Sequence, residues 1–505
     1  MGLTGSEYLE SLDDGREVWL DGQTVRSVPE HPAFRMSARS VAKLYDTLHD
    51  PRHSKAIQWT TPRGAVSHKA FRIARTRRHL QERADAMRYW SRMHFGMLGR
   101  SPDYKAGLAV SLGAHPGFFA PFQDNCQNWY EKLADEVLFL GHVGVNPMVD
   151  RSKASHELPD VNVRVVAERD DGFVVRGAKM VGTAAAFTHH NLVFSSAPVP
   201  LNDADQAHAL VFLVPTGAPG LKLLCRPSYE AQAAGRTPFD YPLSSRFDEN
   251  DATLVFDDVF IPWEDTFVYR DATKANEFFV RAQVVQNLML HGAVRFATKM
   301  SFLAGLLMKL TATNGTAAYR GVRIKVGEIV GLVWTMNALV RDACAHPDPG
   351  PNGSVAPSHR SIFAARALAP MIYPRVREAI LEVGAGGLMQ LPSSAADLLN
   401  AELRPYIDLF YRGTGVDAED RVKLWKLAWD AIGSEFGARH ELFERNYAGS
   451  FDNVRLENLF LAERNGDGPE WTGLVDDALG DYDLHGWTRR PWADDAEEQA
   501  TGSDS

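Results

Sequence analysis

The chain has 505 residues, of which 45% are hydrophobic and 23% are charged, and its formal net charge is −10. This length allows about two to four domains, and the balanced composition excludes a disordered or fibrous chain. The negative charge disfavours nucleic acids and anionic membranes as partners, because phosphate groups bind to concentrated basic surface. Since no apolar run reaches the roughly 18 residues of a membrane span and residues 1–21 lack a signal-peptide core, we expect a soluble cytoplasmic protein.

The spacing of apolar residues predicts a helical segment followed by a β segment. Between residues 37 and 140 the spacing is helical, and two stripes are formed by Val41, Leu44, Tyr45 and Leu48 and by Trp129, Leu133, Val137 and Leu140. Between residues 161 and 267 the period is two, which predicts strands at residues 161–166, 173–181, 191–194, 209–214, 221–224 and 252–256. Strands at this spacing without intervening helices indicate an antiparallel barrel or sandwich.

The remainder of the chain is helical again. The pattern predicts helices at residues 276–310, 322–345, 362–383 and 421–446. We expect the first to end near Asn314-Gly315 and the third to be kinked or broken at Pro370 and Pro374. These helices are too apolar to stand alone, so they should pack as a bundle, including across subunits. Residues 481–505 are acidic and predict a flexible tail.

We therefore predict an α+β fold in four parts. They are an N-terminal helical domain (residues 1–145), a central antiparallel β-barrel domain (146–270), a C-terminal four-helix bundle (271–460) and a partly flexible extension (461–505). This order is that of the acyl-CoA dehydrogenase class of flavoproteins, an analogy of fold that carries no function by itself.

Several common catalytic motifs are absent from the sequence. No G-x-G-x-x-G follows a predicted strand, and neither a P-loop nor a G-x-S-x-G motif occurs, which disfavours nicotinamide enzymes, kinases and serine hydrolases. His440 and Glu444 lie four residues apart on one predicted helix but lack the second histidine of a zinc site, so we interpret them as a surface pair. Cys126, Cys225 and Cys344 are far apart, so we expect reduced thiols and no metal site.

Four stretches combine ionisable or aromatic residues with glycine or proline: residues 99–104, 141–151, 179–186 and 435–449. In the first, Ser101 or Asp103 could cap a helix on which Arg100 and Tyr104 lie one turn apart. A purely structural helix start explains this stretch equally well. Similarly, His142 could be a core histidine with satisfied hydrogen bonds.

The chain resembles the 4-hydroxyphenylacetate 3-monooxygenase oxygenase family, the larger component of two-component flavin monooxygenases. The resemblance covers roughly residues 25–455 and is carried by residues 31–35, 42–51, 99–104, 146–151, 225–230, 238–251, 391–397, 433–437 and 439–449. It implies that FADH2 arrives from a separate flavin reductase and reacts with O2 to give a C4a-hydroperoxide. That species would hydroxylate a para-substituted phenol ortho to its hydroxyl, and the family suggests a homotetramer.

The resemblance also implies the site residues. Arg100, Tyr104 and His142 match the phenol-binding and catalytic set, with His142 as hydrogen-bond partner or base and Arg100 as the cation facing the phenolate or peroxide. The residues that match the flavin contacts are Arg100, His142, Asn146, Met148, Val149, Asp150, Arg151, Thr183, Asn446, Tyr447, Ala448 and Gly449.

The predicted substrate lid departs from the family pattern. Residues 195–208 match it only loosely, and Ala197 and Pro198 occupy part of the site expected to bind the substrate carboxylate. Because Pro198 has no N–H to donate, the para substituent could differ from a simple acid and could be tyrosine-like, larger or attached to a carrier protein. The alternatives are an acyl-CoA dehydrogenase or dehydratase, the latter with a [4Fe–4S] cluster, and a non-catalytic flavin- or aryl-ligand-binding relative.

Overall fold

The computed structural model describes residues 2–196 and 200–489. The chain forms two compact units, one that ends at Tyr447 and one that begins at Ala448. Each unit is described separately below. Among the described residues, no helix is both long and apolar enough to cross a lipid bilayer.

The first unit begins with helices that bury the predicted stripes. These helices are α1 (Gly5–Ser11), α2 (Arg35–Asp46), α3 (Pro51–Ile57), α4 (Arg77–Met93), α5 (Ala106–Ala114) and α6 (Gln123–Glu136). The stripe of α2 is confirmed, because Val41, Leu44, Tyr45 and Leu48 are all buried. The second stripe is too long: α6 ends at Glu136, since Val137 adopts a left-handed φ of 54°.

A large sheet forms the centre of this unit. Its strands are β1 (Glu17–Leu20), β2 (Gln23–Val25), β5 (Leu140–Val145), β6 (Arg164–Arg169), β7 (Gly172–Thr183), β8 (His190–Ser196), β9 (Leu210–Pro215), β10 (Leu221–Cys225), β11 (Asp251–Pro262) and β12 (Thr266–Tyr269). Their order is β12-β9-β8-β5-β7-β11-β10-β1-β2, with β6 paired to β7. All six predicted strands are present. The sheet is mainly antiparallel, but β1 pairs with β10 and β5 with β8 in parallel.

Two of these pairings differ from the sequence prediction. Strands β1 and β2 come from the N-terminal segment, where no strand was predicted, and they extend the sheet from β10. Strand β5 begins at Leu140, which the periodicity had assigned to a helix. Strand β1 pairs with β10 and β5 with β8, both distant in the chain, so local periodicity carries little information about β1 and β5.

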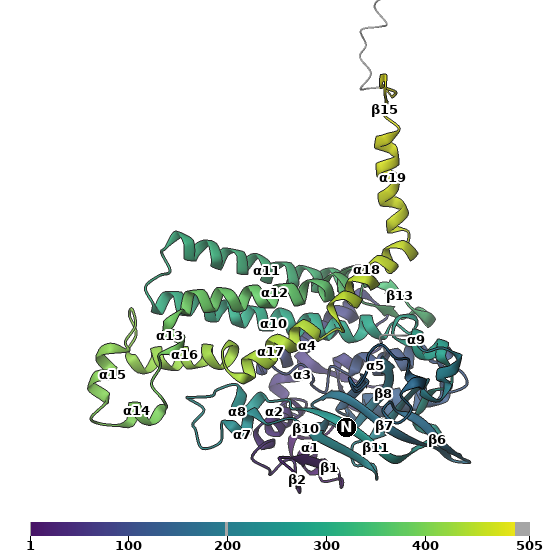
Figure 1. Cartoon of the computed structure of the whole chain (residues 1–505), viewed down its shortest axis with the longest axis horizontal. Coiled ribbons are helices and arrows are strands. Elements are labelled where there is room, and N and C mark those ends of the chain that lie inside the picture. The colour runs from purple at the N-terminus through teal and green to yellow at the C-terminus, as the bar shows by residue number, and fades with distance from the viewer. Residues whose placement is uncertain (1, 197–199, 490–505) are drawn as a thin grey trace, which may run out of the picture. The chain divides into compact units, whose positions relative to one another are not determined.

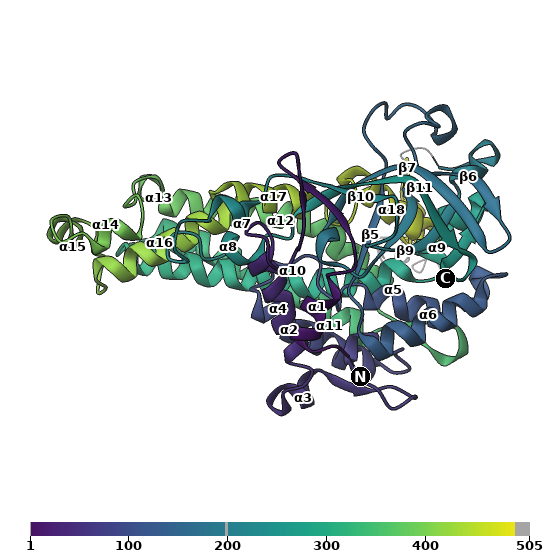
Figure 2. The same ribbon diagram turned by 90° about the horizontal axis from the view of Figure 1, so that it is seen from below.

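Three long helices lie side by side in the helical part of the unit (Figures 1 and 2). They are α10 (Val284–Thr313), α11 (Arg320–Ala345) and α12 (His359–Gly384). The predicted helix at 276–310 is wrong, because α9 (Ala272–Arg281) is separated from α10 by Gln283, whose φ is 52°. The predicted end near Asn314-Gly315 is confirmed, since α10 ends at Thr313 and Gly315 has a φ of 70°.

The prolines do not interrupt α12. Both Pro370 and Pro374 lie inside this helix, so the predicted break is wrong. Packing of α12 between α10 and α11 explains how the helix tolerates two lost backbone hydrogen bonds. The predicted helix at 421–446 is divided instead: α16 (Ala418–Ile432) ends before Gly433, and Ser434 caps α17 (Glu435–Asn446) by accepting a hydrogen bond from the Gly437 amide.

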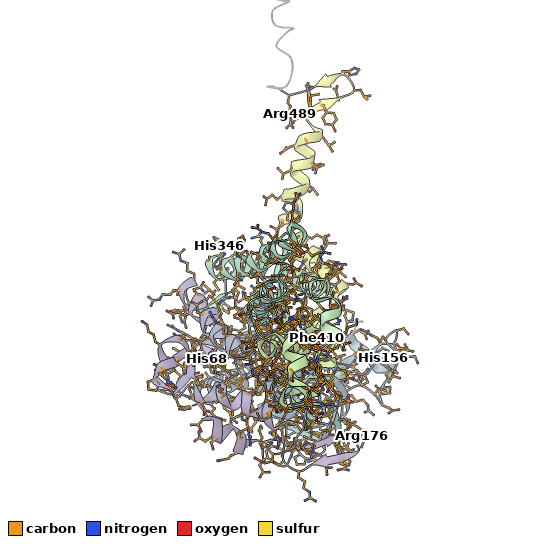
Figure 3. The ribbon with its side chains drawn as sticks, turned by 90° about the vertical axis from the view of Figure 1, so that its left-hand side faces the viewer. His68, His156, Arg176, His346, Phe410 and Arg489 are labelled. Atoms are coloured by element: carbon orange, nitrogen blue, oxygen red, sulfur yellow. The ribbon has the colours of Figure 1, made fainter. Side chains whose placement is uncertain are left out.

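Seen along the long helices, His68 and Arg176 of β7 lie on opposite sides of the view (Figure 3). The remaining elements of this unit are short. They are α7 (Tyr229–Gln232), α8 (Ser244–Phe247), α13 (Gly386–Met389), α14 (Ala395–Leu399), α15 (Arg404–Phe410), and the strand pairs β3 (Gln58–Thr60) with β4 (Val66–His68) and β13 (Asp348–Pro349) with β14 (Val355–Ala356).

The second unit contains α18 (Phe451–Arg464) and α19 (Asp467–Leu479). The hairpin of β15 (Tyr482–Asp483) and β16 (Gly486–Trp487) follows them. The predicted flexible tail is therefore partly wrong, because its first residues form a hairpin. Its remainder, residues 490–505, lies outside the described residues.

Candidate active site

The structure brings together residues from three distant parts of the first unit. Arg100 and Tyr104 lie in the loop between α4 and α5, His142 lies on β5, and Tyr447 directly follows α17. The Arg100 guanidinium carbon is 4.4 Å from the ring centroid of Tyr104 and 4.5 Å from that of Tyr447. The Tyr104 and His142 ring centroids are 5.9 Å apart. We call these four residues the central cluster.

The loop that carries Arg100 and Tyr104 is held by a buried polar triad. The Ser101 hydroxyl donates to Asp103 at 2.6 Å and lies 3.1 Å from His291 on α10. Burial raises the pKa of the Asp103 carboxyl, but the His291 imidazole and the Ser101 hydroxyl outweigh this and hold its pKa below the ordinary value. The predicted helix cap is therefore wrong: α5 begins only at Ala106, and the side chains of Ser101 and Asp103 anchor the loop instead.

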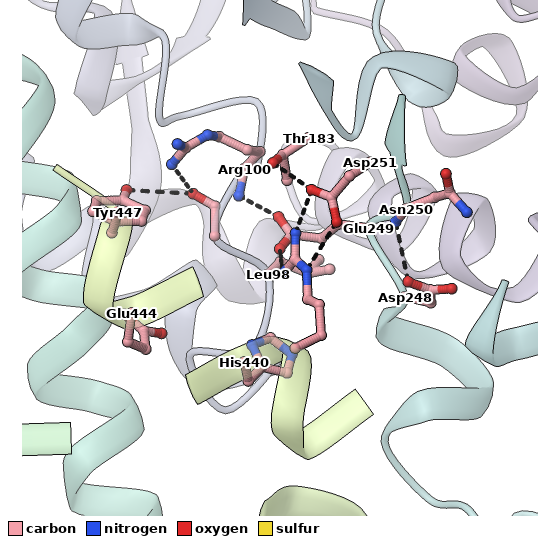
Figure 4. A network of polar contacts seen from close by, with 12 residues as sticks. Leu98, Arg100, Thr183, Asp248, Glu249, Asn250, Asp251, His440, Glu444 and Tyr447 are labelled. Atoms are coloured by element: carbon pink, nitrogen blue, oxygen red, sulfur yellow. Dashed lines mark hydrogen bonds and ion pairs between the residues drawn. The ribbon is translucent and has the colours of Figure 1, made fainter. Parts of the chain in front are cut away.

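The acidic run at residues 248–251 ties this loop to the sheet and to α17 (Figure 4). The Arg100 amide donates to Glu249, which also pairs with Arg439 at 3.2 Å. Asp251 accepts from Arg439 at 2.7 Å and from the Thr183 hydroxyl at 2.6 Å. Burial raises the pKa of Asp251, but Arg439 and then Arg226 hold it well below its ordinary value. The backbone of Arg100 is thus fixed by a charged network.

A second buried network lies beneath Tyr447. Glu444 receives a bidentate pair from Arg295 at 2.6 and 2.7 Å and a third bond from Lys299 at 2.9 Å. Lys299 also contacts His440 at 3.0 Å. The interpretation of His440 and Glu444 as a surface pair is therefore wrong, because both side chains are buried. The Arg295 guanidinium carbon lies 4.6 Å from the Tyr447 ring centroid, so this network supports the ring against which Arg100 packs.

Removing the Glu444 charge should destabilise the protein. Burial raises the pKa of Glu444, but Arg295 and Lys299 outweigh it and bring the pKa to about 2. A lowered pKa stabilises the folded state above the unfolded-state pKa, and this contribution is lost as the pH falls from about 4.5 to about 2. We expect Glu444→Gln to lower the free energy of unfolding by about 3 kcal/mol. Urea unfolding at several pH values should show that the acid-dependent loss is smaller in this variant.

Glu441 on the same helix offers the matched control. It is half-buried and pairs with Arg377 and Arg445. Glu441→Gln should cost less than about 1 kcal/mol, because a partly exposed ion pair contributes little. Equal effects of the two substitutions would contradict the importance assigned to the Glu444 network.

Close packing of α10 against Tyr447 depends on glycine. A Cβ on Gly292 would lie 2.7 Å from Cε1 of Tyr447, whereas a Cβ on Gly305 of the same helix would meet no atom within 4 Å. We expect Gly292→Ala to displace the Tyr447 ring from Arg100 and to lower kcat/KM about tenfold, equivalent to about 1.4 kcal/mol. Gly305→Ala should leave kcat/KM unchanged, so an equally active Gly292→Ala variant would show that the Tyr447 position is unimportant.

His142 is neutral at pH 7. Burial, followed by the charges of Lys105 and Arg100, lowers the pKa of its imidazole well below the ordinary value. Its Nδ1 and the Nε of Arg100 are buried and have no hydrogen-bond partner among the described residues. These unpaired polar atoms indicate that a ligand with oxygen or nitrogen atoms completes the site.

The predicted flavin contacts lie in several different places. Asn146 accepts from the buried Lys179 ammonium at 2.6 Å, and Thr183 donates to Asp251. Asp150 accepts from the backbone and hydroxyl of Ser152. The exposed residues of the set include Met148, Val149, Arg151 and Asn446.

Four further assigned residues cannot be placed within the central cluster. Ala448 and Gly449 belong to the second unit, and Gly449 has a φ of 109°. Ala197 and Pro198, the predicted lid residues, lie outside the described residues. The flavin and lid assignments at these positions stay predictions.

Apolar side chains are exposed on β5, on the loop that follows it and on β7. After His142, β5 and its following loop expose the apolar side chains of Val145, Met148 and Val149, and Val181 on β7 is also exposed. Strand register places Val145 opposite Met180, next to Val181. Exposed apolar side chains of this kind suit the face of a flat ring.

Sequence reasoning missed several residues that shape the site: Lys105, Glu249, Asp251, His291 and Arg295. Glu249 and Asp251 lie in the long run at 238–251 that helped to carry the family resemblance, so their acidic clustering was an available signal. Lys105 directly follows Tyr104. His291 and Arg295 offered no such signal, because only the packing of α10 brings them to the loop.

Residues 4–268 match the family model "4-hydroxyphenylacetate 3-hydroxylase N terminal", and residues 275–468 match "4-hydroxyphenylacetate 3-hydroxylase C terminal". The chain belongs to the 4-hydroxyphenylacetate 3-hydroxylase family.

Individual relatives align over almost the whole chain. The oxygenase component of 4-nitrophenol 2-monooxygenase from Rhodococcus sp is 45% identical, with 96% of this chain and 94% of the relative covered. A (3S)-3-amino-3-(3-chloro-4-hydroxyphenyl)propanoyl-[peptidyl-carrier protein] monooxygenase from Streptomyces globisporus is 43% identical, with 96% and 92% covered. The solved oxygenase component of 4-hydroxyphenylacetate 3-monooxygenase, complexed with FAD and 4-hydroxyphenylacetate, is 32% identical, with a TM-score of 0.88 and 95% and 99% covered.

Proposed function

We propose that this chain is the oxygenase component of a two-component flavin monooxygenase that hydroxylates a para-substituted phenol ortho to its hydroxyl. The observation that supports this most strongly is the central cluster. It combines a fixed guanidinium, a neutral imidazole and two phenol rings, all partly or fully removed from solvent. Such a set can bind a phenol and stabilise its anion.

Three members of the central cluster have distinct parts in this proposal. The neutral His142 ring forms a hydrogen bond with the phenolic hydroxyl and orients it. Arg100 stabilises negative charge on the phenolic oxygen, and this interaction is strong because the surroundings have a low dielectric constant. Tyr104 adds a second hydroxyl and one wall of the site. Ionising the phenol makes its ortho carbon richer in electrons.

FAD is the cofactor, and it binds in its reduced form. Reduced FAD supplies the chemistry that activates O2 and delivers one oxygen atom to the ring. The residues of the first unit that would hold it are Arg100, His142, Asn146, Met148, Val149, Asp150, Arg151, Thr183, Asn446 and Tyr447. By excluding water, these residues and the rest of the site would limit loss of oxygen as H2O2.

The partners follow from the same proposal. A separate flavin reductase supplies FADH2, and the subunits form a homotetramer in the cytoplasm. Assembly through the long helices is supported by their exposed apolar side chains, which are Ile324 and Trp334 on α11 and Met371 on α12. The substrate is a free phenol or one attached to a carrier protein, with Ala197 and Pro198 next to its para substituent.

A product screen tests the function. The full chain is mixed with FADH2, O2 and a panel of para-substituted phenols that includes 4-hydroxyphenylacetate, tyrosine and a carrier-bound tyrosyl group. We expect a catechol from at least one member. Formation of H2O2 alone with every phenol would contradict the proposal.

A further inference from the structure

Lys105 has a buried ammonium group for which the fold provides no acceptor. The side chain is 1% exposed, and its Nζ has no hydrogen-bond partner among the described residues. Burying an unpaired charge is costly, so an amine in this position must be neutral or must pair with a group that the chain does not supply.

The position of Lys105 connects it to the central cluster. Its Nζ lies 4.9 Å from the Tyr104 ring centroid, and the Arg100 guanidinium carbon lies 4.4 Å from the same centroid. Three basic groups therefore surround Tyr104: Arg100, Lys105 and His142. Each of them has a buried nitrogen without a partner among the described residues.

The charges around Lys105 favour its neutral form until an anion binds. The charge of Arg100 acts on Lys105, and the charge of Lys105 acts on His142. Neither Arg100 nor His142 is an anion. The nearest carboxylate in sequence, Asp103, faces Ser101 and His291. Burial, then Arg100, lowers the pKa of Lys105 well below its ordinary value. An anion beside it would raise that pKa again.

Resting on the proposed function, we propose that Lys105 is the base that accepts the phenolic proton of the substrate, directly or through one water. The phenol O–H bond breaks, the proton bonds to the free electron pair of Nζ, and the products are a phenolate and an ammonium ion. No oxidation or reduction accompanies this step, and the proton returns to the product oxygen on release.

Lys105 suits this step better than His142. The Lys105 amine has a free electron pair when it is neutral, and the ammonium formed on protonation has three N–H groups that can donate to the phenolate. The phenolate formed beside it stabilises the ammonium through an opposite charge in a low-dielectric site. His142 then serves to orient the phenol.

The ionisation of a coloured phenol provides a test that does not need turnover. 4-Nitrophenol is titrated into full-chain protein with oxidised FAD, at about one pH unit below its pKa in water, where only about a tenth of the free probe is phenolate. We expect wild-type protein to bind it mainly as the yellow phenolate. Lys105→Met should bind it as the neutral phenol with about tenfold weaker affinity, while Lys43→Met, exposed on α2, should match wild type.

Kinetics on a phenol from the product screen separate the proton-accepting role from a merely structural one. The kcat/KM of Lys105→Met should fall about 100-fold and should then rise with pH up to the pKa of the phenol itself, because only ionised substrate reacts. Lys105→Arg should keep phenolate affinity but show the same pH slope, since arginine does not accept a proton. Unchanged FAD binding shows that the variants are folded.

The outcomes distinguish the two proposals. The assignment of Lys105 would be overturned if Lys105→Met and wild type showed the same phenolate binding and the same pH profile. It would also be overturned if wild-type protein bound the probe only as neutral phenol. If wild-type protein binds no phenol and yields no catechol from the panel, the proposed function fails and the Lys105 assignment fails with it.

Discussion

Arg100→Met should lower kcat/KM for phenol hydroxylation by about 10³-fold, equivalent to about 4 kcal/mol of transition-state stabilisation. The guanidinium lies over the rings of Tyr104 and Tyr447, and its backbone amide is anchored by Glu249. It is thus fixed before substrate arrives, and little reorganisation is needed when negative charge develops. Methionine keeps the bulk and removes the charge. Steady-state assays of catechol formation measure the effect.

Arg39 provides the matched control for this substitution. It is exposed on α2, so Arg39→Met should leave kcat/KM unchanged. If Arg100→Met kept more than about a tenth of wild-type kcat/KM while remaining folded, stabilisation of the phenolate by this guanidinium would be refuted.

His142→Ala should uncouple flavin oxidation from hydroxylation. The neutral ring orients the phenol, so its loss should lower the rate of catechol formation by about 10²-fold and divert reduced flavin to H2O2. Affinity for FAD should change by less than about threefold, because the other contacts persist. Parallel measurement of catechol, H2O2 and FAD binding separates these effects.

A second histidine gives the comparison for His142→Ala. His346, exposed where α11 ends, should tolerate alanine without a change in coupling. Equal losses of FAD affinity and coupling in His142→Ala would refute the orienting role and would make His142 chiefly a flavin contact.

Helices and strands were predictable where the spacing of apolar residues matches the face that the element buries. The strands from β7 to β11 and the helices α2 and α11 follow this rule. The predictions failed where a single backbone conformation decides the result. Gln283 separates α10 from α9 through a positive φ, and nothing in its residue type requires this. Conversely, Pro370 and Pro374 remain inside α12 because packing against α10 and α11 outweighs the lost hydrogen bonds.

The centre of the site was predictable only through the family resemblance. Arg100, Tyr104 and His142 were selected from that resemblance, and the structure brings all three together. The supporting groups depend on contacts between residues far apart in sequence, such as Arg100 with Glu249 and Arg295 with Glu444. Lys105 was missed for another reason: a lysine next to a turn is normally solvated, and only its burial reveals an unusual role.

The most direct test of the central claim follows the oxygen atom. The full chain, FADH2 and a phenol that it hydroxylates are allowed to react under ¹⁸O2 in unlabelled water, and the product is analysed by mass spectrometry. The account predicts that one ¹⁸O atom enters the catechol, at the carbon ortho to the original hydroxyl. A catechol whose new oxygen comes from water would contradict it, as would a label at a carbon that is not ortho to the original hydroxyl.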